Sequence, residues 1–573
     1  MVPTGTRVSM AVKSSRPHFI RTFFIILLAM SALYAVRMAT PDDLSDRDQV
    51  RQCAYILDAA YNAHWLCQVD STGDITSKPP LYSWIGALMV LLFGPNRFSF
   101  SLPAFFGILL AAVVVWQWAW DLEKDERTAW FALLCYLVSS SAIKQLALVR
   151  TDGIFSGLVA LCAWKVWRAW ETGEGWWVTW LYATLAVLAK GPFALVLGFG
   201  GLISLFFQGK DIPQKKLPPH WWNGAILPIA IGGVWSFFSM LTMGSAFYQK
   251  LFVRELWGQF MGSTGKFVGI KRLTSAIKVP LYLISRALPW SLLFFWNPGR
   301  NLFKTFGGRE TERGKRYIIA FIIVGLFFLM TASHKRGDLV FPLLPAMAIL
   351  EGHILSRLSL KMGSRKPILT AILILFTALI LLGYVIMELT FIRPRHKIVA
   401  LGLANKVYTE KIERTMGRFP PLSFRKAPNL EFRLGVTMRN LTHRQVVDLL
   451  SANEKVLILT QHVSELLSSL PRGLKTYRMM EDPKLSYAII SNKPGLFPDK
   501  CMVVATGEWE LKSHGAFIRR VRGSTAWIDP DPGGSIYLKN LKSRGISIRL
   551  ILPKASSRIL NVPSRSTVSV SFP

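Results

Sequence analysis

A stretch of mixed charge follows the first long apolar run of the chain, between residues 46 and 84. Asp48 precedes Arg51 by three residues, and Lys78 comes directly before Pro79 and Pro80. Charge beside a bilayer is expensive, so carboxylates and cations gathered there favour a site able to exchange a proton and bind an anion. The plainer alternative is a solvated loop between two helices.

Three further groups of charge lie at the ends of apolar runs. Arg150 and Asp152 open one run, Lys190 stands before a Gly-Pro break, and Lys335 and Arg336 lie in a short turn. Each group also has an ordinary interpretation: Lys190 could extend to the headgroups, Asp152 could cap its helix, and the basic turn could anchor lipid. Their predicted placement on one membrane face favours a shared site.

Composition indicates a membrane protein. The chain has 573 residues, of which 51% are apolar, and its mean hydropathy is +0.33. Basic side chains number 68 against 34 acidic ones, which gives a net charge of +34. We find no nucleic-acid-binding motif, so membrane lipids with anionic headgroups and phosphate-bearing lipid substrates are the predicted partners.

Apolar runs predict eleven membrane spans, and 80–94 is too short for a comfortable crossing of about 30 Å, so we expect it to lie at the membrane surface. The predicted spans are 19–37, 101–120, 128–145, 154–170, 176–190, 192–208, 222–242, 281–297, 317–332, 339–354 and 368–389. With a cytoplasmic N-terminus, three strongly basic loops then fall inside, as the positive-inside rule requires. Loop 38–100 and the tail after 390 fall outside, and the basic loop 243–280 is an exception to the rule.

The predicted fold is a polytopic α-helical membrane domain with outer juxtamembrane helices, over residues 1–390, followed by a soluble α+β or β-rich domain over 391–573. Short alternating apolar runs after residue 455 read as strands, and DPDPGG at 529–534 reads as a hairpin-type turn. Cys53 and Cys67 share loop 38–100 and could pair if that loop is outside the cytoplasm.

The charged groups, taken in order, resemble a pattern of bacterial polyprenyl-phosphate-sugar glycosyltransferases. The similarity is to the lipid A aminoarabinose transferases and protein O-mannosyltransferases of the C-type membrane glycosyltransferase superfamily, and it covers about residues 1–355. The matching elements are Asp48 with Arg51, KPPL at 78–81 followed by Trp84, Arg150-Thr151-Asp152, LAKGP at 188–192, and SHKR at 333–336 followed by Pro342 and Pro345.

The resemblance implies inverting transfer of a sugar from a polyprenyl-phosphate donor to a lipid A-like, glycan or protein acceptor, on the outer face of the bacterial inner membrane. It gives Asp48 the catalytic role, because a carboxylate must take the acceptor's proton or orient an acceptor phosphate. The implied ligands of the departing phosphate are Arg51, Lys78, Lys190, Lys335 and Arg336, and the implied orienting residues are Arg150 and Asp152.

Two departures from the family pattern bear on substrate and metal. Ser77 stands where aminoarabinose transferases often carry a metal-binding Glu, and loop 243–280 has no His, so we predict no tightly bound cofactor, although a divalent metal is compatible with the site. Leu339-Val340-Phe341 stands where the family often has a Tyr. A non-enzymatic lipid or glycan transporter is the alternative function, and a glycan polymerase or ligase would differ only in its acceptor.

Overall fold

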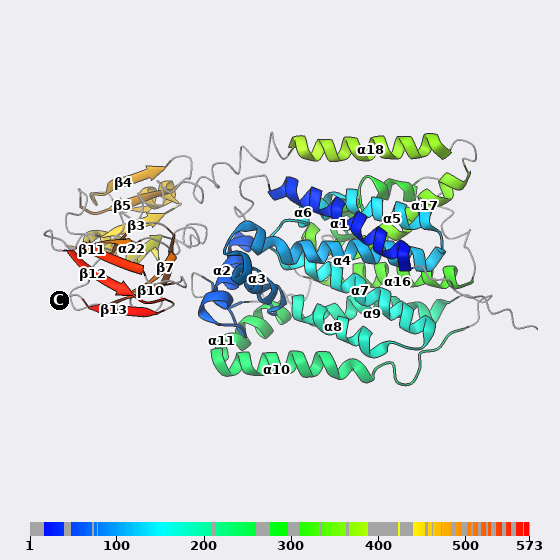
Figure 1. Ribbon diagram of the computed structural model, residues 1–573, viewed down its shortest axis with the longest axis horizontal. Coiled ribbons are helices and arrows are strands. Elements are labelled where there is room, and N and C mark those ends of the chain that lie inside the picture. The colour runs from blue at the N-terminus through cyan, green and yellow to red at the C-terminus, as the bar shows by residue number, and fades with distance from the viewer. Residues whose placement is uncertain are drawn as a thin grey trace, which may run out of the picture. The chain divides into compact units, whose positions relative to one another are not determined.

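Apolar helices make up the N-terminal two thirds of the computed structural model, and strands dominate after Leu422 (Figure 1). The structure describes residues 16–38, 47–70, 74–76, 78–208, 214–258, 276–295, 309–332, 335–361, 366–387, 422–424, 439–452, 456–460, 462–471, 473–482, 487–493, 501–505, 508–513, 517–522, 525–528, 535–540, 546–551, 557–564 and 566–571.

The chain divides into two compact units, each described by itself. The first unit comprises Met1–Ala39, Ser101–Phe237 and Val253–Gly383. The second unit comprises Thr40–Phe100, Phe238–Phe252 and Tyr384–Pro573.

Helices occupy the predicted apolar runs. The α-helices up to residue 387 are α1 (Arg16–Met38), α2 (Arg47–Asn62), α3 (Leu81–Phe93), α4 (Arg97–Glu123), α5 (Glu126–Val138), α6 (Ser140–Gln145), α7 (Thr151–Thr172), α8 (Trp176–Lys190), α9 (Phe193–Phe199), α10 (Ile226–Met243), α11 (Ser245–Tyr248), α14 (Lys278–Arg286), α16 (Arg309–Thr331), α17 (Leu344–Lys361) and α18 (Lys366–Met387). Tighter or wider turns form η1 (Gly200–Phe207), η2 (Asn223–Ala225), η3 (Gln249–Trp257), η4 (Trp290–Phe295) and η6 (Gly337–Leu343).

Among the described residues, five helical stretches are long and apolar enough to cross a membrane. They are Ile20–Met38, Arg97–Glu123, Asn223–Met243, Thr311–Thr331 and Gly337–Lys361, and each contains most or all of a predicted span. The count of eleven spans stays a prediction. The short run predicted at 80–94 forms α3, whose 13 residues extend only about 20 Å at 1.5 Å per residue.

Two predicted spans are interrupted. The run 128–145 breaks at Ser139, whose backbone is extended and whose side chain accepts a hydrogen bond from Ala142 N at the start of α6. The run 281–297 breaks at residues 287–289, between α14 and η4, where Pro289 has no N–H to donate to a helical carbonyl. Apolar character alone therefore gave the wrong continuity at both places.

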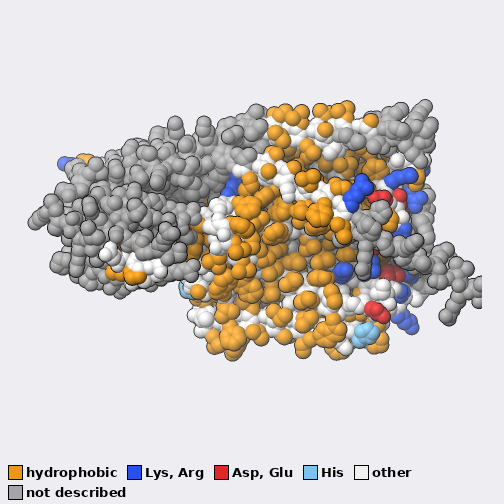
Figure 2. Space-filling view, viewed as in Figure 1, with side chains coloured by type: hydrophobic (Ala, Val, Ile, Leu, Met, Phe, Trp, Pro, Cys, Tyr) orange, Lys and Arg blue, Asp and Glu red, His pale blue; other side chains and the backbone are white. Residues whose placement is uncertain are grey.

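The helices of the first unit pack through small residues and bury their charges at helix ends. A side chain at Gly107 of α4 would overlap the backbone of Ile154 in α7, so these two helices approach closely. Lys315 of α16, only 2% exposed, lies 3.0 Å from Glu123 Oε1 and 3.0 Å from His353 Nε2. Figure 2 shows hydrophobic side chains over the helices and charged ones gathered toward one end.

The second unit has a helical part and a β-rich part. In the helical part α2 packs against α3, and Gly86 leaves room for Ile56, since a Cβ there would lie 2.6 Å from Ile56 Cδ1. In the β-rich part the described α-helices are α22 (His443–Ser451) and α23 (Val463–Ser469). The strands are β1 (Leu422–Phe424), β2 (Arg439–Leu441), β3 (Leu457–Thr460), β4 (Tyr477–Asp482), β5 (Tyr487–Ser491), β6 (Cys501–Ala505), β7 (Glu508–Ser513), β8 (Phe517–Arg522), β9 (Thr525–Ile528), β10 (Ser535–Asn540), β11 (Ile546–Ile551), β12 (Ser557–Val562) and β13 (Thr567–Ser571).

The strands form one mixed and two antiparallel sheets. The mixed sheet has the order β2-β1-β3-β5-β4, with parallel pairing from β2 to β3 and antiparallel pairing from β3 to β4. The others have the orders β13-β10-β7-β8 and β12-β11-β6-β9. Residues 529–534 lie outside the described residues, so the predicted turn stays a prediction; the strands on either side, β9 and β10, belong to different sheets.

The predicted strand-rich character of this region agrees with the sheets, whereas its independence as a domain over 391–573 stays a prediction.

Candidate active site

A short connection between α2 and α3 in the second unit is folded around Asp58. Its carboxylate accepts hydrogen bonds from Val69 N at 2.7 Å and Asn62 Nδ2 at 2.7 Å, and it lies 3.0 Å from His64 Nδ1. Val69 forms an antiparallel bridge with Ile75. These contacts turn the chain back beside α2 and set the direction in which it approaches Lys78.

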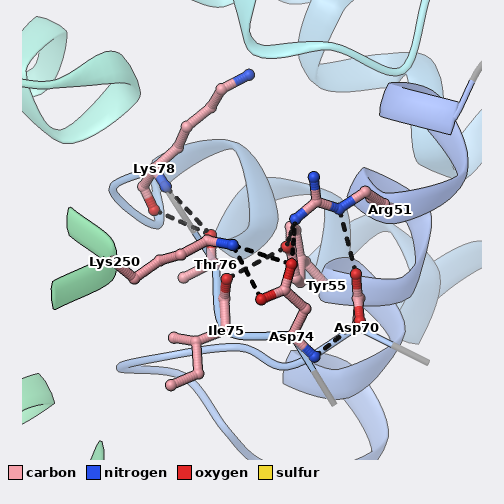
Figure 3. A network of polar contacts seen from close by, with 8 residues as sticks. All are labelled: Arg51, Tyr55, Asp70, Asp74, Ile75, Thr76, Lys78 and Lys250. Atoms are coloured by element: carbon pink, nitrogen blue, oxygen red, sulfur yellow. Dashed lines mark hydrogen bonds and ion pairs between the residues drawn. The ribbon is translucent and has the colours of Figure 1, made fainter. Parts of the chain in front are cut away.

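Arg51 fastens this connection to α2 (Figure 3). Arg51 Nε donates to Asp70 Oδ2 at 3.2 Å, and its Nη2 donates to Asp74 Oδ2 at 3.0 Å and to the Tyr55 hydroxyl at 3.0 Å. Lys250, from η3, approaches from a distant part of the sequence and lies 2.9 Å from both carboxylate oxygens of Asp74. We call Arg51, Asp70, Asp74 and Lys250 the clasp.

The charges of the clasp balance, with two cations facing two carboxylates. Burial alone would lower the pKa of Arg51, but the neighbouring Tyr55, Asp70 and Asp74 outweigh it and hold that pKa above its usual value. Burial raises the pKa of Tyr55, so its hydroxyl keeps its proton and is oriented toward the carbonyl of Ile75. The clasp is thus suited to hold the connection in place.

Lys78 takes its backbone position from the end of this connection. Its N–H donates to Thr76 Oγ1 at 3.4 Å, and the same hydroxyl donates to its carbonyl at 3.1 Å. The Lys78 side chain extends away from the clasp, with its ammonium on the far side from Asp74 (Figure 3). Asp48 lies in the first turn of α2, one turn before Arg51, and is partly buried.

The first unit brings Lys190 and Asp152 together. Lys190 ends α8, where Gly191 has a φ of 112° that favours glycine and Pro192 precedes α9. Its ammonium donates to Asp152 in the first turn of α7, and both side chains are 13% exposed. The N-cap position of α7 is Arg150, so the alternative of Asp152 as the helix cap is wrong.

Arg150 lies in extended backbone and pairs with Asp338 of η6. Its Nη1 lies 3.1 Å from Asp338 Oδ2, and Lys144 Nζ lies 3.5 Å from Asp338 Oδ1. Lys335 is partly buried and donates to the carbonyl of Ala332, whereas Arg336 is exposed.

The structure therefore gives specific partners to several predicted residues. It joins Asp152 to Lys190 within the first unit, and Arg51 to its carboxylates within the second. Because the units are described separately, convergence of Asp48 with the cations of the first unit stays a prediction.

Most of these partners were not predicted from the sequence. Asp70, Asp74 and Tyr55 were not predicted beside Arg51, and Lys144 and Asp338 were given no role in the site. The one usable signal was the basic loop 243–280, which breaks the positive-inside rule and contains Lys250. The partner of Lys250 is Asp74, a carboxylate of the chain itself.

No group of three His, Cys, Asp or Glu side chains able to hold a metal occurs among the described residues, and Ser77 lies outside them, so the cofactor prediction stays untested. Cys53 and Cys67 are free thiols in the structure, and both are buried.

Comparison with known proteins supports the sequence interpretation. The family of dolichyl-phosphate-mannose-protein mannosyltransferases matches residues 77–237. The crystal structure of ArnT from Cupriavidus metallidurans bound to undecaprenyl phosphate superposes with a TM-score of 0.62 at 15% identity, covering 84% of this chain and 99% of that one. The apo structure of the same protein superposes with a TM-score of 0.63. The predicted resemblance is confirmed.

Curated relatives agree with this resemblance to polyprenyl-phosphate-sugar glycosyltransferases. The undecaprenyl phosphate-alpha-4-amino-4-deoxy-L-arabinose arabinosyl transferase of Enterobacter sp. (strain 638) is 25% identical over 298 residues, which are 48% of this chain and 48% of that protein. An uncharacterized protein of Aquifex aeolicus (strain VF5) is 24% identical over 298 residues, or 50% of this chain and 54% of that protein. The chain spans about half the length of these relatives. The fold of this chain is that of a multi-pass helical membrane protein.

Proposed function

We propose that this protein is an inverting glycosyltransferase that moves a sugar from a polyprenyl-phosphate donor to an acceptor on the outer face of the bacterial inner membrane. The observation that carries the proposal is the fold, which matches nearly the whole of a structure with undecaprenyl phosphate bound. The acceptor is a lipid A-like molecule, a glycan or a protein, and the orientation has the N-terminus in the cytoplasm.

Asp48 acts on the acceptor in this proposal. It takes the proton from an acceptor hydroxyl, or orients an acceptor phosphate, while the acceptor oxygen bonds to the anomeric carbon. The bond from that carbon to the donor phosphate breaks on the opposite face, which inverts the configuration. The position of Asp48 in the first turn of α2 supports this role, because Arg51, one turn later on the same helix, is held by the clasp.

Cations stabilise the departing polyprenyl phosphate. Lys78 suits this role because its ammonium extends away from the balanced charges of the clasp (Figure 3). Lys335 and Arg336 are the corresponding candidates in the first unit. Lys190 is held by Asp152, so this pair supplies a positioned ammonium to the sugar or the phosphate. Arg51 contributes by fixing the connection that leads to Lys78.

The transporter alternative predicts ionisable residues at mid-membrane depth in broken or paired helices. The Glu123–Lys315 pair lies at the end of α4 and near the start of α16, whereas Glu351 is buried within α17, so the position of charge does not separate the two functions and the assay below does.

The test is Asp48→Asn in membrane vesicles supplied with a lipid-linked sugar. We expect a loss of transfer on the order of 10²-fold or more, because the amide cannot accept the proton. The matched control is Asp448→Asn, which changes an exposed carboxylate on α22 and should leave transfer unchanged. Full transfer by Asp48→Asn would refute the assignment, and flux driven by an ion gradient that this substitution leaves intact would support a transporter.

A further inference from the structure

Arg286, the last residue of α14, lies against the turn that carries Lys335 and Arg336. A Cβ built on Gly337 would lie 2.8 Å from Arg286 Nη2 and 2.9 Å from its Nε. The guanidinium therefore occupies the space that a side chain at position 337 would need. The packing of α14 against η6 brings the two segments together, although about 50 residues of sequence separate them.

The contacts of Arg286 leave part of its hydrogen-bonding capacity unused. Its Nε is buried, and within the described part of the chain no group accepts a hydrogen bond from it. An arginine that served only the dipole at the C-terminal end of α14 could keep its N–H groups in water. A buried N–H without an acceptor is costly, so its retention beside the turn indicates a ligand that supplies the acceptor.

The nearby carboxylate is already shared. Asp338, next to Gly337, pairs with both Arg150 and Lys144. Arg286 thus adds a further cation beside a turn whose carboxylate already faces Arg150 and Lys144. Cations gathered in this way favour the binding of an anion.

We propose that Arg286 and the Gly337 turn form a binding site for a phosphate group of a substrate. A guanidinium fork matches phosphate oxygens in a bidentate way. Arg150, 3.1 Å from Asp338 Oδ2, supplies a second guanidinium at the same turn. The site takes a phosphate monoester or diester of a lipid, and this choice of ligand rests on the proposed function. A side chain at 337 would displace the guanidinium from the position it holds beside the turn.

The phosphate can come from the donor or from a phosphorylated acceptor, and two probes separate these sources. Purified full-length protein in detergent micelles is titrated with undecaprenyl phosphate, and transfer in vesicles is measured as a function of diphosphorylated lipid A. We expect Arg286→Gln to weaken one of the two by about 10- to 100-fold, the range for a lost charge-assisted hydrogen bond. Binding or half-saturation of Arg286→Lys should fall between that of the wild type and that of Arg286→Gln.

Gly337→Ala provides an independent test, because it displaces the guanidinium without removing charge and should weaken the same probe. The matched control is Arg127→Gln, an exposed cation at the start of α5. Weaker undecaprenyl phosphate binding assigns the site to the donor, and a raised half-saturation for lipid A with intact undecaprenyl phosphate binding assigns it to the acceptor.

The inference is overturned if Arg286→Gln and Gly337→Ala both match Arg127→Gln with both probes, while the wild type binds and transfers normally. That result would leave the proposed function standing. A wild type that binds neither probe would overturn both.

Discussion

The clasp gives a quantitative prediction about the connection between α2 and α3. Replacing Asp74 by Asn removes the carboxylate that faces Arg51 and Lys250 at 3.0 and 2.9 Å. The Asp74 side chain is 28% exposed and that of Lys250 is 17% exposed, so the pair lies between a solvated and a buried one. Exposed pairs contribute up to about 1 kcal/mol, and hydrogen bonds to charged groups about 1.5–3 kcal/mol.

We therefore expect Asp74→Asn to lower the free energy of unfolding by about 2 kcal/mol, because both cations lose their shared partner. Lys250→Met should cost less, since Arg51 still faces Asp74. The assay is equilibrium unfolding in detergent micelles of both single variants and the double variant. The coupling energy of the Asp74–Lys250 pair should be about 1 kcal/mol.

The control for this cycle is the Glu312–Arg316 pair, which joins successive turns of α16 at 2.6 Å. Its coupling should be only about 0.3–0.5 kcal/mol, as for other pairs on one helix. Single-variant costs at Asp74 and Lys250 that add within about 0.3 kcal/mol would refute the clasp as a cooperative unit.

Two further predictions concern the first unit. Gly107→Ala should lower the free energy of unfolding by about 2 kcal/mol or more, because its Cβ would lie 2.2 Å from Ile154 Cα and backbone must move. Asp125 caps α5 and accepts hydrogen bonds from Thr128 and Ser356. Burial alone would raise the pKa of Asp125, but these hydrogen bonds hold it below its usual value. The cap therefore stabilises the folded protein at pH values above the unfolded-state pKa of Asp125. This contribution is lost as the pH falls through the folded-state pKa of Asp125.

These two predictions are checked by the same unfolding measurement. Gly232→Ala on α10 is the packing control: nothing lies within 4 Å of its Cβ, so it should be neutral or stabilising. If Gly107→Ala behaves like Gly232→Ala, the close approach of α4 and α7 is wrong. For Asp125→Ala, the stability difference from wild type should be about 1 kcal/mol near neutral pH and shrink in acid. A difference that grows on acidification would contradict the sign.

Helix positions were accessible from sequence because they depend on local apolar character. The run predicted at 176–190 is the helix α8, and Lys190 was recognised at its end because Gly-Pro terminates a helix. The breaks at Ser139 and Pro289 were not predicted, since an apolar run looks the same whether or not a helix continues through it.

The sequence by itself also determined the resemblance to the glycosyltransferases, because short motifs kept their order and spacing along the chain. Only the tertiary structure decided which charges face each other. Lys250 and Asp74 are 176 residues apart, and Lys144 and Asp338 are 194 apart. Arg286 meets Gly337 only because α14 packs on η6. Partner choice of this kind follows from how helices pack in three dimensions, and neither hydropathy nor motif spacing carries that information.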